Sequence, residues 1–261
     1  MQQQSFTKSL FFILASVLLC FSFHSKAQNI VKKVAEKTNQ PLRIAVASNF
    51  TPALKKLLVE FHQQTHIKTQ IISGATGAMF IQIQHGAPFD IFIAADSLRP
   101  KKLEQQGLVV ANSRKTYAQG QLALLSMNSK AHLNDLRTVP PRFAIANPDT
   151  APYGKAAKQV LTHLGLWQQY QAALIIGMNI NQTFSQVRTQ AVNSGLVANS
   201  QLVINNLSGV IIPANYHQPI VQQLVILKNS SNINKAQQLS NYLLSKSVQQ
   251  KIIQFGYAGI E

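Results

Sequence analysis

Residues 42–52, which read LRIAVASNFTP, decide the fold of this chain. The first six are small, apolar or β-branched apart from one arginine, a pattern typical of a short buried strand. Three of the residues that follow favour a helix N-cap: Ser48, Asn49 and Thr51. Pro52 suits the first turn of a helix. We therefore predict a buried strand that runs directly into a helix N-terminus.

A turn of this kind presents backbone N–H groups without partners, and the helix dipole favours an anion beside them. Taken alone, residues 48–52 are also compatible with an ordinary capped turn that binds nothing. The same pattern of strand, small polar turn and helix start recurs in three further turns, at residues 73–77, 147–154 and 177–183. Because the carboxyl ends of parallel strands meet at one sheet edge, these turns indicate a ligand site there.

Strands and helices alternate along the chain, which indicates an α/β protein with mostly parallel strands. Further strands are expected at 66–72, 89–96, 121–127, 142–146, 174–176, 196–198, 202–204, 210–213 and 224–227. Helices are expected to start in the four turns and at residue 97, and two more close the chain at 233–244 and 248–255. Two ligand-ready turns in each half indicate two lobes that face a cleft. The expected limits are 41–122 with 226–261 for the first lobe and 123–225 for the second.

The N-terminal 27 residues have the features of a secretory signal peptide. Lys8 supplies a positive charge, and residues 9–23 form an apolar run of 15 residues. Residues 25–27 read SKA, a small–x–small cleavage site. We predict cleavage after residue 27, a polar leader at 28–40, and a periplasmic protein.

Cys20 is the only cysteine of the chain, so the predicted mature protein has no disulfide and no thiol chemistry. A lipid anchor on Cys20, or an uncleaved membrane anchor, is the alternative. Lipidation normally needs a small residue before the cysteine, and Leu19 stands there.

The formal net charge is +16, which could serve nucleic acid, an anionic membrane surface or anionic ligands. The positive residues are dispersed, and no basic run interleaves with aromatic residues as in single-strand binders. We therefore exclude nucleic acid and interpret the charge as a solvated surface that steers anions inward.

The four turns contain no Arg or Lys. Hydroxyls and backbone N–H groups without a charged donor suit an oxyanion recognised by size and donor count. An enzyme would need a nucleophile beside a base, and the only titratable side chains in the turns are Asp149 and Tyr153. A basic structural protein of the cell envelope would not need four such turns.

Two pairs of titratable residues lie outside these turns. Asp90 and Asp96 could form a catalytic carboxylate pair, but we favour Asp96 as a helix cap and Asp90 as the anchor of a loop. His62 and His66 are four residues apart and could share a metal. Zinc sites usually take three or four ligands, and no third one is near in sequence, so we expect both at the surface.

Short motifs occur in a set order: ASNF at 47–50, GATG at 74–77, GAPFDIF at 86–92, AAD at 94–96, PYG at 152–154, NI and QT within 179–183, and IPA at 212–214 near Pro219 and Ile220. In this order and spacing, residues 42–260 resemble the periplasmic molybdate-binding proteins of ABC importers. The resemblance implies a two-lobe (type II) periplasmic binding protein fold with a mixed, mostly parallel sheet in each lobe. It also implies a monomer that is not an enzyme and needs no cofactor. Such a protein holds molybdate or tungstate by neutral hydrogen bonds and delivers it to a permease in the inner membrane.

Carried over by position, the resemblance implies five oxyanion-binding residues: Ser48, Asn49, Thr76, Tyr153 and Ile180. Ile180 would act through its backbone, and Tyr153 through its backbone with or without its side chain. Some family members place a ligand tyrosine where this chain has Ala198, whereas others use the tyrosine of a PYG loop, which this chain has. The preferred oxyanion therefore stays open, with sulfate and chromate as alternatives.

Overall fold

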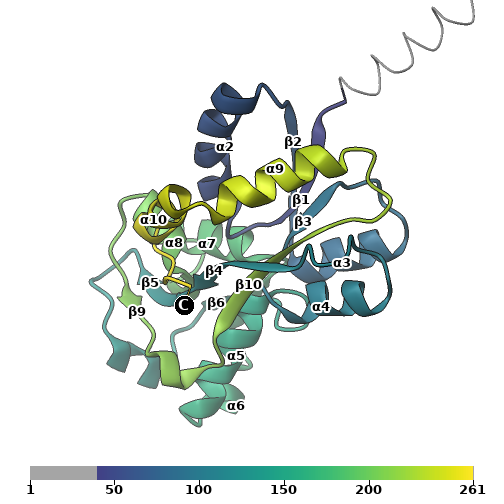
Figure 1. Ribbon diagram of the computed structural model, residues 1–261. Helices are drawn as coiled ribbons and strands as arrows, with labels where there is room; N and C mark the ends of the chain where they lie inside the picture. The colour runs from purple at the N-terminus through teal and green to yellow at the C-terminus, as the bar shows by residue number, and fades with distance from the viewer. Residues whose placement is uncertain (1–39, 261) are drawn as a thin grey trace, which may run out of the picture. The chain divides into compact units, whose positions relative to one another are not determined.

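The computed structural model describes residues 40–260, and the predicted signal peptide with Cys20 and nearly all of the leader lie outside them. The described chain is an α/β protein of two lobes, each built on a five-stranded sheet (Figure 1). None of its helices is long and apolar enough to cross a membrane, within residues 40–260.

The first sheet has the strand order β2-β1-β3-β10-β4. Strands β1, β2 and β3 are parallel, whereas β10 runs antiparallel to β3 and β4. Its strands are β1 (Leu42–Ala47), β2 (Thr69–Gly74), β3 (Ile91–Ile93), β4 (Lys115–Gly120) and β10 (Ile220–Ile226). Its helices are α2 (Thr51–Thr65), α3 (Thr76–Gln84), α4 (Leu98–Gln105), α9 (Ile233–Leu244) and α10 (Lys246–Gln254).

The second sheet has the order β7-β6-β8-β5-β9, in which β6 is parallel to β7 and β8 while β5 is antiparallel to its neighbours. Its strands are β5 (Leu122–Ser126), β6 (Phe143–Ala146), β7 (Leu174–Gly177), β8 (Ser194–Ala198) and β9 (Val210–Ile211). Its helices are α5 (Pro152–His163), α6 (Trp167–Tyr170), α7 (Ile180–Arg188) and α8 (Asn199–Ile204), with 3₁₀ turns η1 (Leu133–Arg137) and η2 (Ala214–Tyr216).

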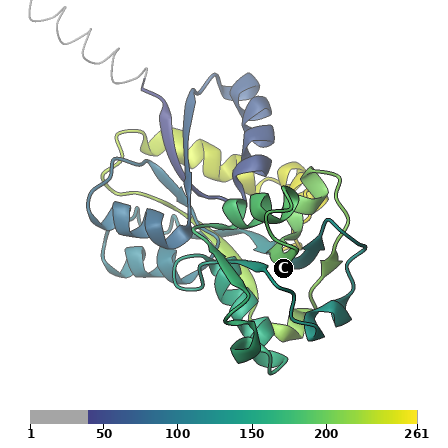
Figure 2. The same cartoon turned by 180° about the vertical axis from the view of Figure 1, so that it is seen from behind.

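Each sheet is covered by helices on both faces. Successive side chains of a strand point to opposite faces and therefore pack against different helices. In β1, Ile44 and Val46 pack with α2, α9 and α10, whereas Ala45 packs with α3 and α4. Figures 1 and 2 show α3 and α4 side by side, away from α2 and α9. In β5, Leu124 packs with α5 and Leu125 with α7 and α8. Strands buried on both faces read as continuous apolar runs, which is why β1 is visible in the sequence.

The chain crosses between the sheets at two places. A single residue, Gln121, separates β4 from β5. The return crossing lies between β9 and β10, in segment 212–219, since all of β10 pairs within the first sheet. The expected lobe limit at residue 225 cuts through β10, so the sheets place this crossing earlier in the chain.

Several predicted elements were wrong in type or extent. Residues 202–204 belong to α8 and not to a strand, because Gln201 folds back to accept a hydrogen bond from the Ala198 N–H and starts a helix. Strand β2 starts at residue 69 and not 66, because His66 has a φ of 56° and ends α2. Strand β4 was missed, because its sequence KTYAQG has little apolar character.

Four further boundaries differ from the predictions. The third strand is short, Ile91–Ile93, and β10 starts four residues before the predicted 224. Two glutamines interrupt the apolar pattern of β10 and hid its beginning. At the start of α2 none of the three candidate caps is used: Phe50 is the N-cap and no side-chain cap bond forms. The last helix, α10, starts at 246.

Asp90 anchors a loop, as predicted. This buried carboxylate accepts hydrogen bonds from the Arg43 N–H at 2.7 Å, the Ser230 hydroxyl at 2.6 Å and the Asn232 amide at 3.2 Å. It therefore ties the start of β1 to the segment that precedes α9. Asp96 accepts from the Arg99 N–H at 3.0 Å in the first turn of α4, which is the predicted capping role.

We expect Asp90→Ala to lower the free energy of unfolding by about 3 kcal/mol or more, because three donors in a buried setting lose their charged acceptor. Urea denaturation followed by circular dichroism measures this. Asp135→Ala is the matched control, because the exposed Asp135 also caps a backbone N–H, that of His132 at 2.8 Å. Its loss should be about 1 kcal/mol or less. Equal losses in the two variants would contradict the anchoring role of Asp90.

Candidate functional site

The four predicted turns meet around one small pocket with a cavity volume of about 10 Å³. All five predicted binding residues line it: Ser48, Asn49, Thr76, Tyr153 and Ile180. The remaining walls are apolar or glycine, namely Ala47, Gly74, Ala75, Ala95, Ala151 and Pro152. Pockets for drug-sized ligands measure about 300–1,000 Å³ and one water needs about 10–15 Å³, so the pocket suits only a very small ligand.

The pocket is rich in hydrogen-bond donors that the protein itself does not use. Within residues 40–260, no acceptor bonds the backbone N–H groups of Asn49, Thr76, Tyr153 and Ile180. Asn49 lies in the turn after β1, and Tyr153 lies in the first turn of α5. Thr76 and Ile180 are the first residues of α3 and α7. Helix starts leave such groups free because no preceding turn supplies carbonyls. The donors therefore come from both lobes.

Two hydroxyls add to these donors. Ser48 is 4% exposed, and its hydroxyl has no hydrogen-bond partner among the described residues. Thr76 is 1% exposed, and its oxygen accepts from the Ala95 N–H at 3.1 Å. That bond orients the Thr76 side chain and leaves its hydrogen available to a ligand.

No charged side chain is among the residues that line this pocket in the described part of the chain. Arg99 of α4 comes near from outside the four turns. It pairs with Asp96 and donates from Nη2 to the Asp149 carbonyl at 2.9 Å. Its charge is thus balanced by its own neighbour, and the pocket wall stays neutral.

The two lobes are bonded to each other beside the pocket. The Gly77 N–H of α3 donates to the Thr150 carbonyl at 2.8 Å, next to the bond from Arg99 to Asp149. We call these two bonds the clasp. A Cβ at Gly77 would lie 2.9 Å from the Thr150 oxygen, so a residue without a side chain is needed there. The clasp shows that the lobes are closed on this side.

A buried polar network lies behind the pocket. The Asn49 amide donates to Gln222 Oε1 at 3.0 Å and to the Tyr257 hydroxyl at 3.3 Å. The Tyr257 hydroxyl donates in turn to the Asn49 carbonyl at 3.0 Å. Both amide hydrogens of the Asn49 side chain are therefore donated to residues behind the pocket. Its backbone N–H is left for a ligand. Sequence reasoning did not identify Gln222 or Tyr257, and the only signal for Gln222 was a polar residue inside an apolar strand.

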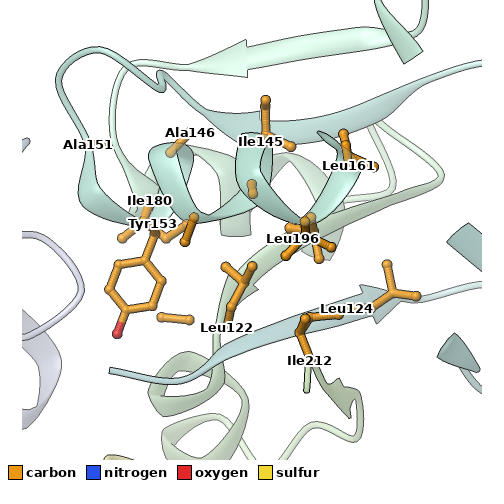
Figure 3. Close-up of a cluster of buried hydrophobic side chains, with 14 of the residues drawn as sticks. Leu122, Leu124, Ile145, Ala146, Ala151, Tyr153, Leu161, Ile180, Leu196 and Ile212 are labelled. Atoms are coloured by element: carbon orange, nitrogen blue, oxygen red, sulfur yellow. The ribbon is translucent and has the colours of Figure 1, made fainter. Parts of the chain in front are cut away.

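Tyr153 extends from the first turn of α5 with Ala151 and Ile180 close by (Figure 3). Its hydroxyl accepts from Gln222 Nε2 at 3.1 Å. Burial raises the pKa of Tyr153 well above the usual value of a tyrosine, and it does the same for Tyr117 and Tyr257. All three phenols are therefore neutral at physiological pH.

The other candidate residues lie away from the pocket. Ala198 is fully buried and is not among the lining residues. His62 and His66 are exposed, as predicted, with ring centroids 6.4 Å apart. Residues 40–260 contain no group of three or more side chains suited to a metal ion. A larger hollow of about 350 Å³ shares Ala95, Ala151 and Pro152 with the pocket, but its mixed charges and width do not suit a single small ion.

The sequence model of the family of bacterial extracellular solute-binding proteins matches residues 42–258 of this chain. The chain belongs to this family. This solute-binding protein is 39% identical over 225 residues to a molybdate-binding protein of Azotobacter vinelandii. The alignment covers 83% of this chain and 89% of the relative. It is 34% identical over 218 residues to a molybdate-binding protein of Rhodobacter capsulatus. That alignment covers 82% of this chain and 86% of the relative.

A solved structure agrees with these relatives. The periplasmic molybdate-binding protein of Azotobacter vinelandii superposes on this solute-binding protein with a TM-score of 0.79 at 36% identity. The superposition covers 84% of this chain and 100% of the other. The expected two-lobe binding-protein fold is therefore confirmed.

Proposed function

We propose that this solute-binding protein captures molybdate or tungstate outside the cytoplasmic membrane and delivers it to the permease of an ABC importer. The observation that carries the proposal is the neutral pocket on which unused N–H and O–H donors of both lobes converge. Two relatives that are more than 30% identical are named for binding molybdate, which favours the same ligand here.

The donor set suits a tetrahedral oxyanion that carries no proton. We propose that the hydroxyls of Ser48 and Thr76 and the N–H groups of Asn49, Tyr153 and Ile180 donate to its oxygens. The described lining contains no carboxylate that could accept the proton of an ion such as hydrogen phosphate. A protonated oxyanion would therefore find no charged acceptor for its own donor, which disfavours it relative to a dianion. Sulfate and chromate remain the alternatives, because they too are dianions.

An enzymatic function has no support in this pocket. Among the lining residues described, the only nucleophile types are Ser48, Thr76 and Tyr153, and no His, Lys or carboxylate stands beside them as a base. Nucleophilic catalysis needs that pairing.

We further propose that the chain is exported and cleaved after Ala27, so that the mature periplasmic protein begins at Gln28. The extracellular family and the signal-like N-terminal sequence support this. The intact mass of protein recovered from the periplasm checks it. A mass that still includes Met1, or a lipid on Cys20, would refute it.

The proposed donors predict how two variants bind. Ser48→Ala and Thr76→Val should each weaken molybdate binding by about 1.5–3 kcal/mol, the range for hydrogen bonds to charged groups. Isothermal titration calorimetry with molybdate, tungstate, sulfate, chromate and phosphate measures this and ranks the ions. Ser185→Ala is a control, because Ser185 lies on α7 and is not among the lining residues. Wild-type affinity in Ser48→Ala and Thr76→Val would place the site elsewhere.

The neutral lining predicts how binding depends on pH and salt. Between about pH 6 and 9 the side chain that ordinarily titrates is histidine, and none lines the pocket in the described chain. The raised pKa of Tyr153 keeps that phenol neutral as well. We therefore expect the equilibrium affinity to change little over this range.

Sodium chloride should mainly slow association, because surface charge steers encounter and is screened beyond about 8–10 Å. Stopped-flow binding across pH and salt gives both rates. An affinity that falls as histidines lose their protons, or a salt effect mainly on dissociation, would mean that a charged residue contacts the anion.

A further inference from the structure

Gln222 is a fully buried glutamine at an irregular point of β10. It is 0% exposed, and the pairing of β10 with β4 shifts register between Gln222 and Gln223. A bulge places one extra residue in one of two paired strands; here it is Tyr117 of β4, because Gln222 pairs with Ala118 and Gln223 with Thr116. The next residue, Gln223, bonds Arg114 at 3.0 Å and Thr116 at 3.1 Å, within the first sheet. Gln222 instead bonds the residues behind the pocket.

The Gln222 amide joins one ligand-facing turn of each lobe. Its Oε1 accepts from Asn49 Nδ2 at 3.0 Å and from the Tyr117 hydroxyl at 2.8 Å, both in the first lobe. Its Nε2 donates to the Tyr153 hydroxyl at 3.1 Å, in the second lobe. Asn49 and Tyr153 also carry two of the free N–H groups that face the pocket.

The end of β4 leaves room for this contact. A Cβ on Gly120 would lie 2.3 Å from the Tyr153 hydroxyl and 2.7 Å from Gln222 Nε2. Any other residue at this position would push the phenol and the amide apart. Two features of β4 thus accompany the bond between the lobes: the extra residue Tyr117, whose hydroxyl bonds Gln222, and the glycine at residue 120.

We propose that Gln222 is a positioning residue that couples the two anion-facing turns, an inference that rests on the proposed function. The bond from Gln222 to Tyr153 joins the two lobes in the closed arrangement seen here, so it favours that state. The bond from Asn49 to Gln222 holds the first turn in the orientation that presents its N–H to the anion. Gln222 therefore raises affinity without touching the ligand, by making the closed, ligand-ready state more populated.

The decisive comparison is between Gln222→Met and Gln223→Met. Both remove one amide from β10 and keep the side-chain length, but only the first breaks the link between the lobes. Calorimetry with molybdate should show at least about tenfold weaker binding by Gln222→Met and less than about twofold by Gln223→Met. A residue that merely filled the core would lower the melting temperature and leave the closure of the lobes unchanged.

Closure is read by double electron–electron resonance between spin labels on cysteines introduced at the exposed Lys101 of α4 and Gln168 of α6, with Cys20→Ser. Gln222→Met should show a longer or broader distance distribution than wild type and Gln223→Met, without ligand and at equal molybdate. Identical distributions in Gln222→Met and wild type would overturn the proposal, as would wild-type affinity of Gln222→Met.

Tyr153→Phe tests the same bond from the other lobe and keeps the buried ring, so it also serves if Gln222→Met does not fold. It should weaken binding about threefold or more in the wild-type background and add nothing in the Gln222→Met background, because the two residues act through one bond. Full additivity would mean that the Tyr153 hydroxyl contacts the anion itself and would overturn the coupling. If wild type binds no oxyanion, the proposed function fails, and the distance distributions of the ligand-free proteins decide about Gln222.

Discussion

Backbone N–H groups without acceptors are the constraint on which this structure depends. A buried donor that finds no partner costs about 1–3 kcal/mol, and native proteins leave few of them. Here Asn49, Thr76, Tyr153 and Ile180 each present one to the same pocket. Three of these donors lie at helix starts, where a hydrogen bond within the helix is impossible, and Asn49 lies in the turn before α2. The proposed anion would satisfy all four together.

The charge of the chain and the chemistry of the pocket are separate properties. The chain carries a formal net charge of +16, yet Arg99, which contacts the turn at 147–154, is paired with Asp96 and donates a second hydrogen bond to the Asp149 carbonyl. A free guanidinium at this place would attract any anion, protonated or not. A neutral wall selects by donor number and fit instead. The basic surface can then raise the rate of encounter while the pocket decides which ion stays.

Local sequence signals predicted the parts of the fold that are local in origin. Strand β1, the helix starts at residues 76, 152 and 180, and the anchoring role of Asp90 were all visible in short stretches. Because the strands bring those turns to one edge, the five predicted binding residues lie around one pocket, although their role as donors is still a proposal. Gln222 could not be predicted, since its partners lie 173, 105 and 69 residues away. Strand β4 and helix α8 were missed or mistaken because pairing and packing outweigh their weak local pattern.

The connection between β4 and β5 is one residue, Gln121, and this brevity limits how the lobes can move. A link this short cannot lengthen, so sliding of one sheet past the other is blocked at that point. The segment 212–219 gives the second crossing more slack. Rotation of the lobes about their two connections remains possible, and opening on the side of the clasp would require its two bonds to break. A transporter that binds both lobes and turns them apart would therefore weaken the clasp and release the proposed ion.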